Sequence, residues 1–172
     1  KVEITVHGDL DHPQHQKTLQ IPRTVNSLKN DLSKILFQKS TSDCTLIVGE
    51  EESSMETINA HKAILCARSP VFHAMLQSRS DGYGEEMKFG EGFENTVRIS
   101  DMEPDVMRSL CTYMYTETCS DATLNVNADK ILRAATKYQV LGLVNVTEEF
   151  LSRNISIQNA CDMLYLADLY CA

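Results

Sequence analysis

The side chains best suited to binding a metal ion gather near the start of the sequence. They offer imidazole nitrogens and carboxylate oxygens and belong to His7, Asp9, Asp11, His12 and His15. Their spacing matches no helical or hairpin ligand set, and the proline and glutamines among them indicate a solvated turn. We therefore expect no metal site.

A second reactive-looking stretch is INAHKAILCARSPVF, residues 58–72. His61 and Cys66 would supply the base and the thiol of a nucleophile pair, but five residues apart on a helix they face different sides. Pro70 pushes the residue before it out of the helical region and suits the first turn of a new helix. The stretch therefore predicts two short helices, 61–69 and 70–78, that meet at a corner.

Other catalytic signatures are absent from the sequence. It contains no glycine-rich nucleotide loop, no HExxH and no GxSxG, so we expect no catalytic residue and no cofactor. The 6 cysteines form no C-x-x-C pair, which argues against both a disulfide framework and a zinc module. We expect them to be small buried side chains.

Composition excludes several classes of partner. The 172 residues are 42% hydrophobic and carry a net charge of −8, so a nucleic-acid backbone would be repelled. No stretch approaches the ~18 apolar residues of a membrane helix, and the first residues lack the apolar core of a signal peptide. These features predict a protein of a reducing, intracellular compartment.

Periodicity predicts an α+β domain that runs into a helical extension. Period-two or continuous apolar runs predict strands at 2–7, 17–22, 42–49, 55–60 and 96–99. Three- and four-residue spacing predicts helices at 24–37, 103–116, 126–140, 143–155 and 156–170, in addition to the two short ones. Residues 79–95, with four glycines, predict a long exposed loop.

The helix predicted at 24–37 has an apolar stripe with no obvious cover. Leu28, Leu32, Ile35 and Leu36 recur on one face between polar residues. Because the helix precedes the main domain, the stripe must pack on that domain or on a second chain.

A charged pair is expected at the start of the strand at 42–49. A carboxylate at Asp43 is costly in a buried position unless it is paired, and Lys62 follows the neighbouring strand. We expect an ion pair between them that is structural or that helps to specify a partner chain.

Four segments together resemble the BTB/POZ domain. They are SDCTLIVG, INAHKAILCARSPVFHAML, VRISDMEPDVMRSLCTYMYT and ADKILRAATKYQVLGL, and they cover residues 42–143 in the family's order. NISIQNACDMLYLADLY further resembles the speckle-type POZ protein group, in which a MATH domain precedes the BTB domain. The resemblance implies a remnant strand and linker at 1–23, a BTB/POZ domain at 24–143 and the start of a truncated helical extension at 144–172.

In that group the BTB domain forms homodimers. The resemblance places the dimer interface on Leu28, Leu32, Ile35, Leu36, Asp43, Lys62 and Ile64. It implies a nuclear or cytoplasmic adaptor of a cullin-3 ubiquitin ligase, whose substrates bind a domain outside this chain.

The resemblance also implies a surface that binds the cullin-3 N-terminal domain. The family's apolar-any-Glu triplet corresponds to Tyr83-Gly84-Glu85 or to Phe89-Gly90-Glu91, and the same surface would include Leu76, Tyr113 and Tyr115. A disordered acidic insertion is the alternative interpretation of this loop. We expect exposed apolar area on the last helix, since its partner helix is missing.

Two other functions compete with the adaptor. The same dimer could present a groove to corepressor peptides, as in BTB zinc-finger regulators, although here helices continue directly after Leu141. A potassium-channel-type tetramer fits the Ala-His-Lys motif and the N-terminal helix less well, and an enzyme fits least.

Overall fold

The computed structural model describes residues 27–51, 54–77 and 95–170. The N-terminal histidine cluster and the strands predicted at 2–7 and 17–22 lie outside this range. So does nearly all of the loop predicted at 79–95.

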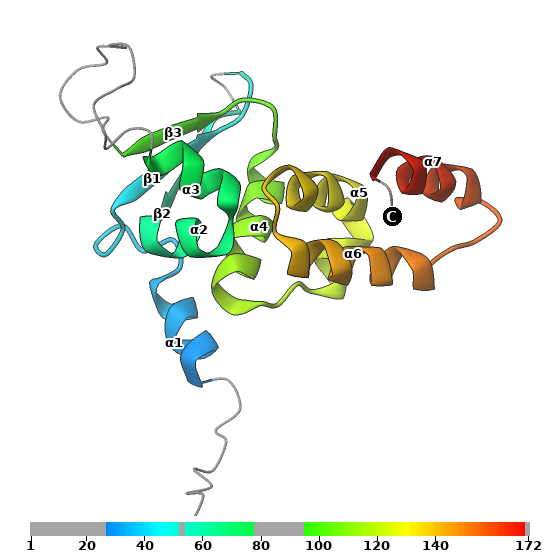
Figure 1. Cartoon of the computed structure of the whole chain (residues 1–172), viewed down its shortest axis with the longest axis horizontal. Helices are drawn as coiled ribbons and strands as arrows, with labels where there is room; N and C mark the ends of the chain where they lie inside the picture. The colour runs from blue at the N-terminus through cyan, green and yellow to red at the C-terminus, as the bar shows by residue number, and fades with distance from the viewer. Residues whose placement is uncertain (1–26, 52–53, 78–94, 171–172) are drawn as a thin grey trace, which may run out of the picture.

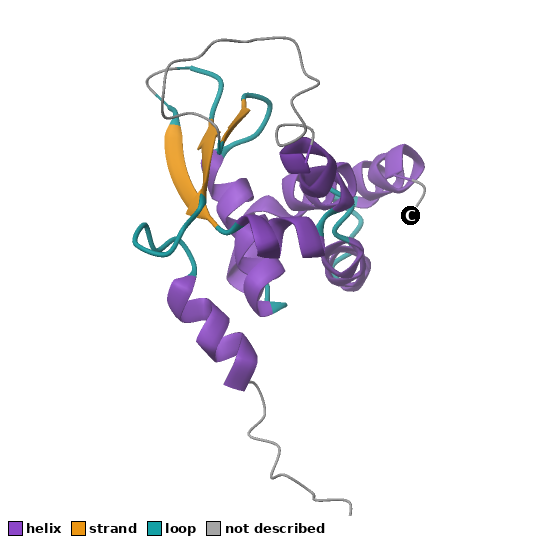
Figure 2. Ribbon diagram, turned by 60° about the vertical axis from the view of Figure 1, so that its left-hand side comes forward, coloured by secondary structure: helices purple, strands orange, loops and turns teal. Residues whose placement is uncertain are grey.

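A small mixed sheet forms one layer of the molecule (Figure 2). It consists of β1 (Cys44–Val48), β2 (Glu56–Ala60) and β3 (Thr96–Ile99) in the order β2-β1-β3. β1 is antiparallel to β2 and parallel to β3, with Leu46 opposite both Ile58 and Val97. These three side chains are fully buried, so the middle of the sheet belongs to the core.

The turn after β1 requires a glycine. Gly49 has a φ of +129°, and a Cβ there would lie 2.8 Å from the carbonyl oxygen of Ser54. Only a residue without a side chain fits this close approach of the hairpin backbone.

Seven helices are described around the sheet (Figure 1). They are α1 (Ser27–Ile35), α2 (Lys62–Arg68), α3 (Pro70–Gln77), α4 (Pro104–Thr116), α5 (Asp121–Lys137), α6 (Leu141–Arg153) and α7 (Ala160–Tyr170). α2 and α3 lie beside the sheet, α4 runs through the centre, and α5 and α6 continue away from it toward α7. The predicted α+β architecture is confirmed.

The helix corner predicted at Ser69-Pro70 is confirmed. Ser69 is extended, with φ −142° and ψ 115°, and separates α2 from α3. Its buried hydroxyl donates to the Tyr138 carbonyl oxygen at 2.6 Å and accepts from the Phe72 N–H at 3.1 Å. The Phe72 ring stacks on the Tyr138 ring at 4.6 Å between centroids. The stacking and the Ser69 hydrogen bond together hold α3 against the end of α5.

Two helices, α5 and α7, begin more than one helical turn away from the predicted residue. α5 starts at Asp121 because Ser120 caps it, accepting from the Thr123 N–H at 3.2 Å, and a kink at Asn127 hid this first turn from the apolar pattern. α7 starts at Ala160, since the Asn159 side chain accepts from the Ser156 N–H at 2.6 Å and forms a turn before it. Within the described residues, no helix is both long and apolar enough to cross a membrane.

Candidate interaction surface

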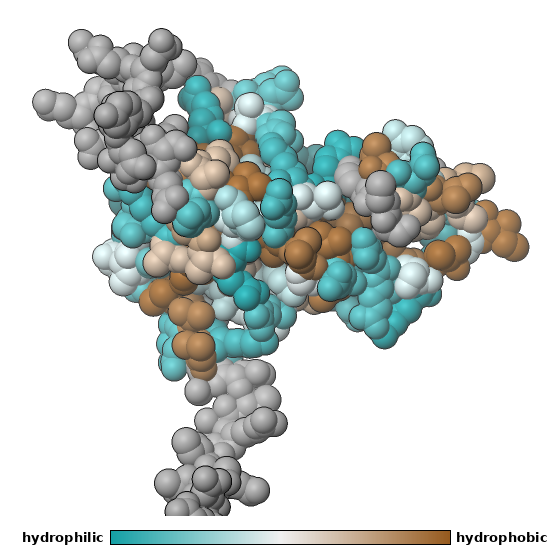
Figure 3. Space-filling model, in the orientation of Figure 1, coloured by the Kyte–Doolittle hydropathy of each residue, from teal (hydrophilic) through white to brown (hydrophobic). Residues whose placement is uncertain are grey.

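The first helix lies against α4 with part of its apolar stripe uncovered. Leu32, Ile35 and Leu36 are half-buried against the core, whereas Leu28 is 69% exposed. Hydrophobic side chains line the visible face of α1 in Figure 3. We call Leu28, Leu32 and Ile35 the α1 patch. Ile64 of α2, which the resemblance adds to the interface, is also half-buried.

One end of α1 is tied to the body through Glu117. This residue caps α4 in the left-handed conformation, with a φ of 53°. Its carboxylate lies 2.8 Å from the Lys29 ammonium and 3.0 Å from the Arg68 guanidinium. The Lys29 hydrogen bond and the charge of Arg68 lower the pKa of Glu117. Glu117 therefore joins α1, α2 and α4.

The other end of α1 is tied down through Arg108. The guanidinium lies 5.5 Å from the centroid of the Phe37 ring and 2.5 Å from the Glu56 carboxylate. Phe37 itself has a φ of +61°, which turns the chain sharply after α1. These contacts join the end of α1 to α4 and β2, so the α1 patch is held at both ends.

Asp43 and Lys62 do come together, but not as the predicted ion pair. The Asp43 carboxylate accepts from the backbone N–H of Lys62 at 2.7 Å, and the Lys62 ammonium bonds the side-chain carbonyl of Asn95. The difference follows from position, because Asp43 precedes β1 and faces the start of α2, where backbone N–H groups lack intrahelical partners. Asp43 is exposed, so it needs no compensating cation.

A hydrogen-bond chain at His61 was not foreseen from the sequence. The Tyr115 hydroxyl lies 2.8 Å from both the His61 backbone nitrogen and His61 Nδ1, and His61 Nε2 lies 3.0 Å from Thr41 Oγ1. Tyr115 is 2% exposed, and burial raises its pKa. Both ring nitrogens are thus engaged, and the described structure holds no His61–Cys66 nucleophile pair.

The cysteines follow the prediction only in part. Burial raises the pKa of Cys44 to about 11 and that of Cys111 to about 12, so both stay as thiols at neutral pH. Cys66 and Cys119 are half-buried, whereas Cys161 is exposed. The described cysteines are all free.

Three residues assigned to the cullin surface lie in the core. Leu76 and Tyr113 are 6% exposed and Tyr115 2%, so only a small part of each side chain reaches the surface of the single chain. The reason is packing: Tyr113 meets the start of α6, where a Cβ on Gly142 would come within 2.6 Å of its hydroxyl. Tyr83, Glu85, Phe89 and Glu91 lie outside the described residues.

A hollow of about 460 Å³ lies between the β1–β2 turn, the start of α4 and α5. Its charges are largely compensated, with Lys130 against Glu103 at 2.7 Å and Asp101 against Lys137 at 2.5 Å. The Lys137 hydrogen bond lowers the pKa of Asp101. Across the described residues, no three His, Cys, Asp or Glu side chains are grouped to hold a metal ion. We assign the hollow no chemistry.

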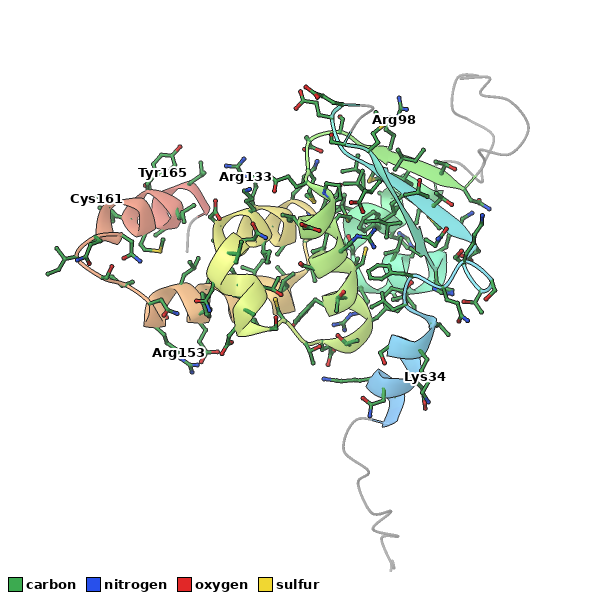
Figure 4. All side chains as sticks on the ribbon, turned by 180° about the vertical axis from the view of Figure 1, so that it is seen from behind. Lys34, Arg98, Arg133, Arg153, Cys161 and Tyr165 are labelled. Carbon is green, nitrogen blue, oxygen red and sulfur yellow. The ribbon has the colours of Figure 1, made fainter. Side chains whose placement is uncertain are left out.

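The far end of the molecule also exposes apolar side chains, as predicted. Ile157 before α7 is 96% exposed, and Leu164 and Tyr165 on α7 are also exposed. Tyr165 points away from the body in Figure 4.

Comparison with known proteins gives a consistent result. The family model of the BTB/POZ domain matches residues 17–155. The chain is 35% identical over 168 residues to TD and POZ domain-containing protein 3 of Mus musculus and 36% identical over 143 residues to TD and POZ domain-containing protein 5 of the same species. It spans 42% and 38% of the length of these relatives, respectively. In structure it resembles the BTB domain of zebrafish PATZ1, with a TM-score of 0.55, 19% identity and coverage of 73% of this chain and 89% of that one.

Proposed function

The chain belongs to the BTB/POZ domain family, and from this premise we propose that it pairs with a second copy and recruits cullin-3 as a substrate adaptor of a ubiquitin ligase. BTB domains are protein-interaction modules. The observation that supports pairing is the α1 patch, an apolar strip held at both ends yet left partly uncovered.

The energetics favour a second copy of the chain as the cover of the α1 patch. Full burial of an aliphatic side chain contributes ~1.5–3 kcal/mol of stabilising free energy. Leu28 is largely exposed in the single chain, so most of that contribution would come from its burial in the dimer. A two-fold dimer buries the patch of both copies, so each residue contributes twice to the free energy of pairing. Asp43 and Lys62 would lie at the rim of this interface, where Asp43 fixes the start of α2 next to Ile64.

Cullin recruitment is supported by the resemblance to cullin adaptors and by the chain's helical continuation. α6 leads within a few residues to α7. Because little of Leu76, Tyr113 and Tyr115 is exposed, we propose that the main contact lies in the residues between α3 and β3. Its anchor would be Tyr83-Gly84-Glu85 or Phe89-Gly90-Glu91. An apolar anchor with a neighbouring charge is a common arrangement for a binding hot spot. Substrates would bind a domain outside this chain.

The test is a titration with the cullin-3 N-terminal domain, followed by the mass of the complex in solution. We expect two copies of the chain to bind two cullin domains, and we expect either Glu85→Ala or Glu91→Ala to weaken binding at least tenfold. Leu28→Asp should give a one-to-one complex. No binding by the wild type would contradict the adaptor proposal and leave a corepressor-binding module as the alternative. An unaltered affinity in both Glu variants would contradict only the assignment of the anchor.

A further inference from the structure

We infer that His61 is a pH-sensitive positioning residue, whose neutral imidazole holds the segment between α1 and β1 so that the α1 patch can pair. The inference rests on the proposed pairing of two copies. It arises from a chain of hydrogen bonds that connects the core with the surface. Mild acid is expected to break this chain and weaken the dimer.

Three segments far apart in the sequence meet at His61. Tyr115 comes from the end of α4, His61 from the junction of β2 and α2, and Thr41 from the segment between α1 and β1. The contacts are 2.8 Å from Tyr115 Oη to Nδ1 and 3.0 Å from Nε2 to Thr41 Oγ1. The imidazole is therefore the bridge between the buried tyrosine and this connection.

The position of each proton follows from the number of donors. The Tyr115 oxygen already accepts the backbone N–H of His61, so its single proton is donated to His61 Nδ1. Nε2 must then carry the ring proton and donate it to Thr41 Oγ1, whose own proton reaches the Gln38 carbonyl oxygen at 3.3 Å. Every polar atom of the chain is satisfied by the neutral ring in this one tautomer.

A second ring proton disrupts this arrangement. It would place an N–H on Nδ1 facing the Tyr115 oxygen, and the tyrosine would have to turn its proton away. Tyr115 is buried and, in the described part of the chain, its hydroxyl has no acceptor other than His61 Nδ1 to which it could donate. A buried donor without an acceptor is costly, so protonation of the ring favours its withdrawal from the site.

The charged groups around the ring are engaged with other partners. Asp43 at the start of β1 holds the Lys62 N–H, and the Lys62 ammonium holds Asn95. The negative charge of Asp43 would stabilise a cationic ring and the positive charge of Lys62 would destabilise it, so the two effects offset each other. The titratable neighbours of Tyr115 on β1 and α4 are Cys44 and Cys111, and both are neutral thiols.

Breaking the hydrogen bond to Thr41 would affect α1. The turn after α1 depends on Gln38, whose N–H donates to the Ile35 carbonyl oxygen at 3.1 Å and whose carbonyl accepts from the N–H groups of Thr41 and Ser42. The His61 ring connects this turn to Tyr115 on α4 through its hydrogen bond with Thr41. When the ring withdraws, the turn loses this link to Tyr115, and only the contacts of Glu117 and Arg108 and the packing of Leu32 and Ile35 still position α1. We expect the α1 patch to be held less firmly as a result.

The experiment measures the dimer dissociation constant between pH 7.5 and 5.5 at constant ionic strength, for the wild type, His61→Asn and His73→Asn. Asparagine keeps an acceptor near the Nδ1 position and does not titrate, while His73 is exposed on α3 and serves as the matched control. We expect the wild-type constant to rise on the order of tenfold in acid, His73→Asn to follow it, and His61→Asn to stay flat. A flat wild type, or an equal acid response in His61→Asn, would overturn the inference.

A second readout separates this inference from the dimer proposal. The imidazole nitrogen resonances of His61 report its tautomer in a monomer as well as in a dimer. We expect an unprotonated Nδ1 and a protonated Nε2 at pH 7.5, and we expect the hydrogen bond between Tyr115 and Nδ1 to break in acid. The opposite tautomer would refute the hydrogen-bond chain, whereas the expected tautomer in a wild type that is monomeric throughout would refute pairing alone.

Discussion

Several of the described helices expose apolar side chains, and of α1 and α7 only α1 is held in a defined position by described polar contacts to other elements. Glu117 ties one end of α1 to α2 and α4, and Arg108 ties Phe37 to α4 and β2. The described contacts of α7 are mainly with α5, and its apolar residues lie on several sides of the helix. Exposed apolar area therefore has different meanings: on α1 it forms an oriented surface ready for a partner, whereas on α7 nothing described determines what covers it.

The largest expected effect is that of Leu32→Asp. Leu32 is half-buried against its own core and belongs to the α1 patch, so a carboxylate there disturbs both. We expect monomers and a loss of about 2–3 kcal/mol in the free energy of unfolding. Sedimentation velocity and urea unfolding measure the two effects, and a stable dimer of this variant would remove α1 from the interface.

Arg108→Gln tests whether the contacts of Arg108 with Phe37 and Glu56 are needed to position the end of α1. The change removes both the interaction with the Phe37 ring and the ion pair with Glu56, and we expect it to reduce stability by about 1 kcal/mol and to weaken the dimer. Arg98→Gln, on the exposed face of β3, is the control. Equal behaviour of the two variants would show that Phe37 does not depend on Arg108.

Glu117→Gln has a smaller expected effect, because its ion pairs are partly exposed and screened by solvent. We expect about 0.5 kcal/mol of lost stability and a few-fold weaker dimer, more pronounced at low salt. Glu149→Gln, whose partner Arg153 lies on the same helix, is the control.

The pH dependence of the Glu117 ion pairs has a definite sign. Since Lys29 and Arg68 lower the pKa of Glu117, its contribution is present above the ordinary value of 4.5 and disappears as the pH decreases through the lowered value in the folded protein. Unfolding curves below pH 4.5 should therefore differ less between wild type and Glu117→Gln than curves at pH 7. A difference that grows in acid would contradict the assigned ion pairs.

The smallest effect is expected on α7. Leu164→Ser should change the free energy of unfolding by less than about 0.5 kcal/mol and leave the dimer intact, because Leu164 is exposed. Loss of the dimer in this variant, measured by sedimentation, would mean that α7 and not α1 carries the pairing surface.

The sequence predicted the parts of the molecule that depend on local patterns. Apolar spacing indicated α1 and its stripe, and Pro70 indicated the corner between α2 and α3. Local patterns are informative there because side chains three or four residues apart share a helix face.

The parts that were missed depend on distant contacts. The role of His61 arises from Thr41, 20 residues away, and from Tyr115, 54 residues away. Asp43 was expected to pair with the Lys62 ammonium, but its carboxylate accepts from the Lys62 backbone N–H, which only the geometry of the α2 start reveals. The burial of Tyr113 likewise depends on its packing against Gly142, which no spacing rule contains.

The most direct test of the central claim compares two exposed leucines by sedimentation equilibrium. Leu28 on the α1 patch is 69% exposed and Leu141 at the start of α6 is 71% exposed, so neither change should harm the fold. We predict that the wild type and Leu141→Asp are dimers and that Leu28→Asp is a folded monomer. A dimeric Leu28→Asp, or a wild type that stays monomeric at high concentration, would contradict the assignment of α1 as the pairing surface.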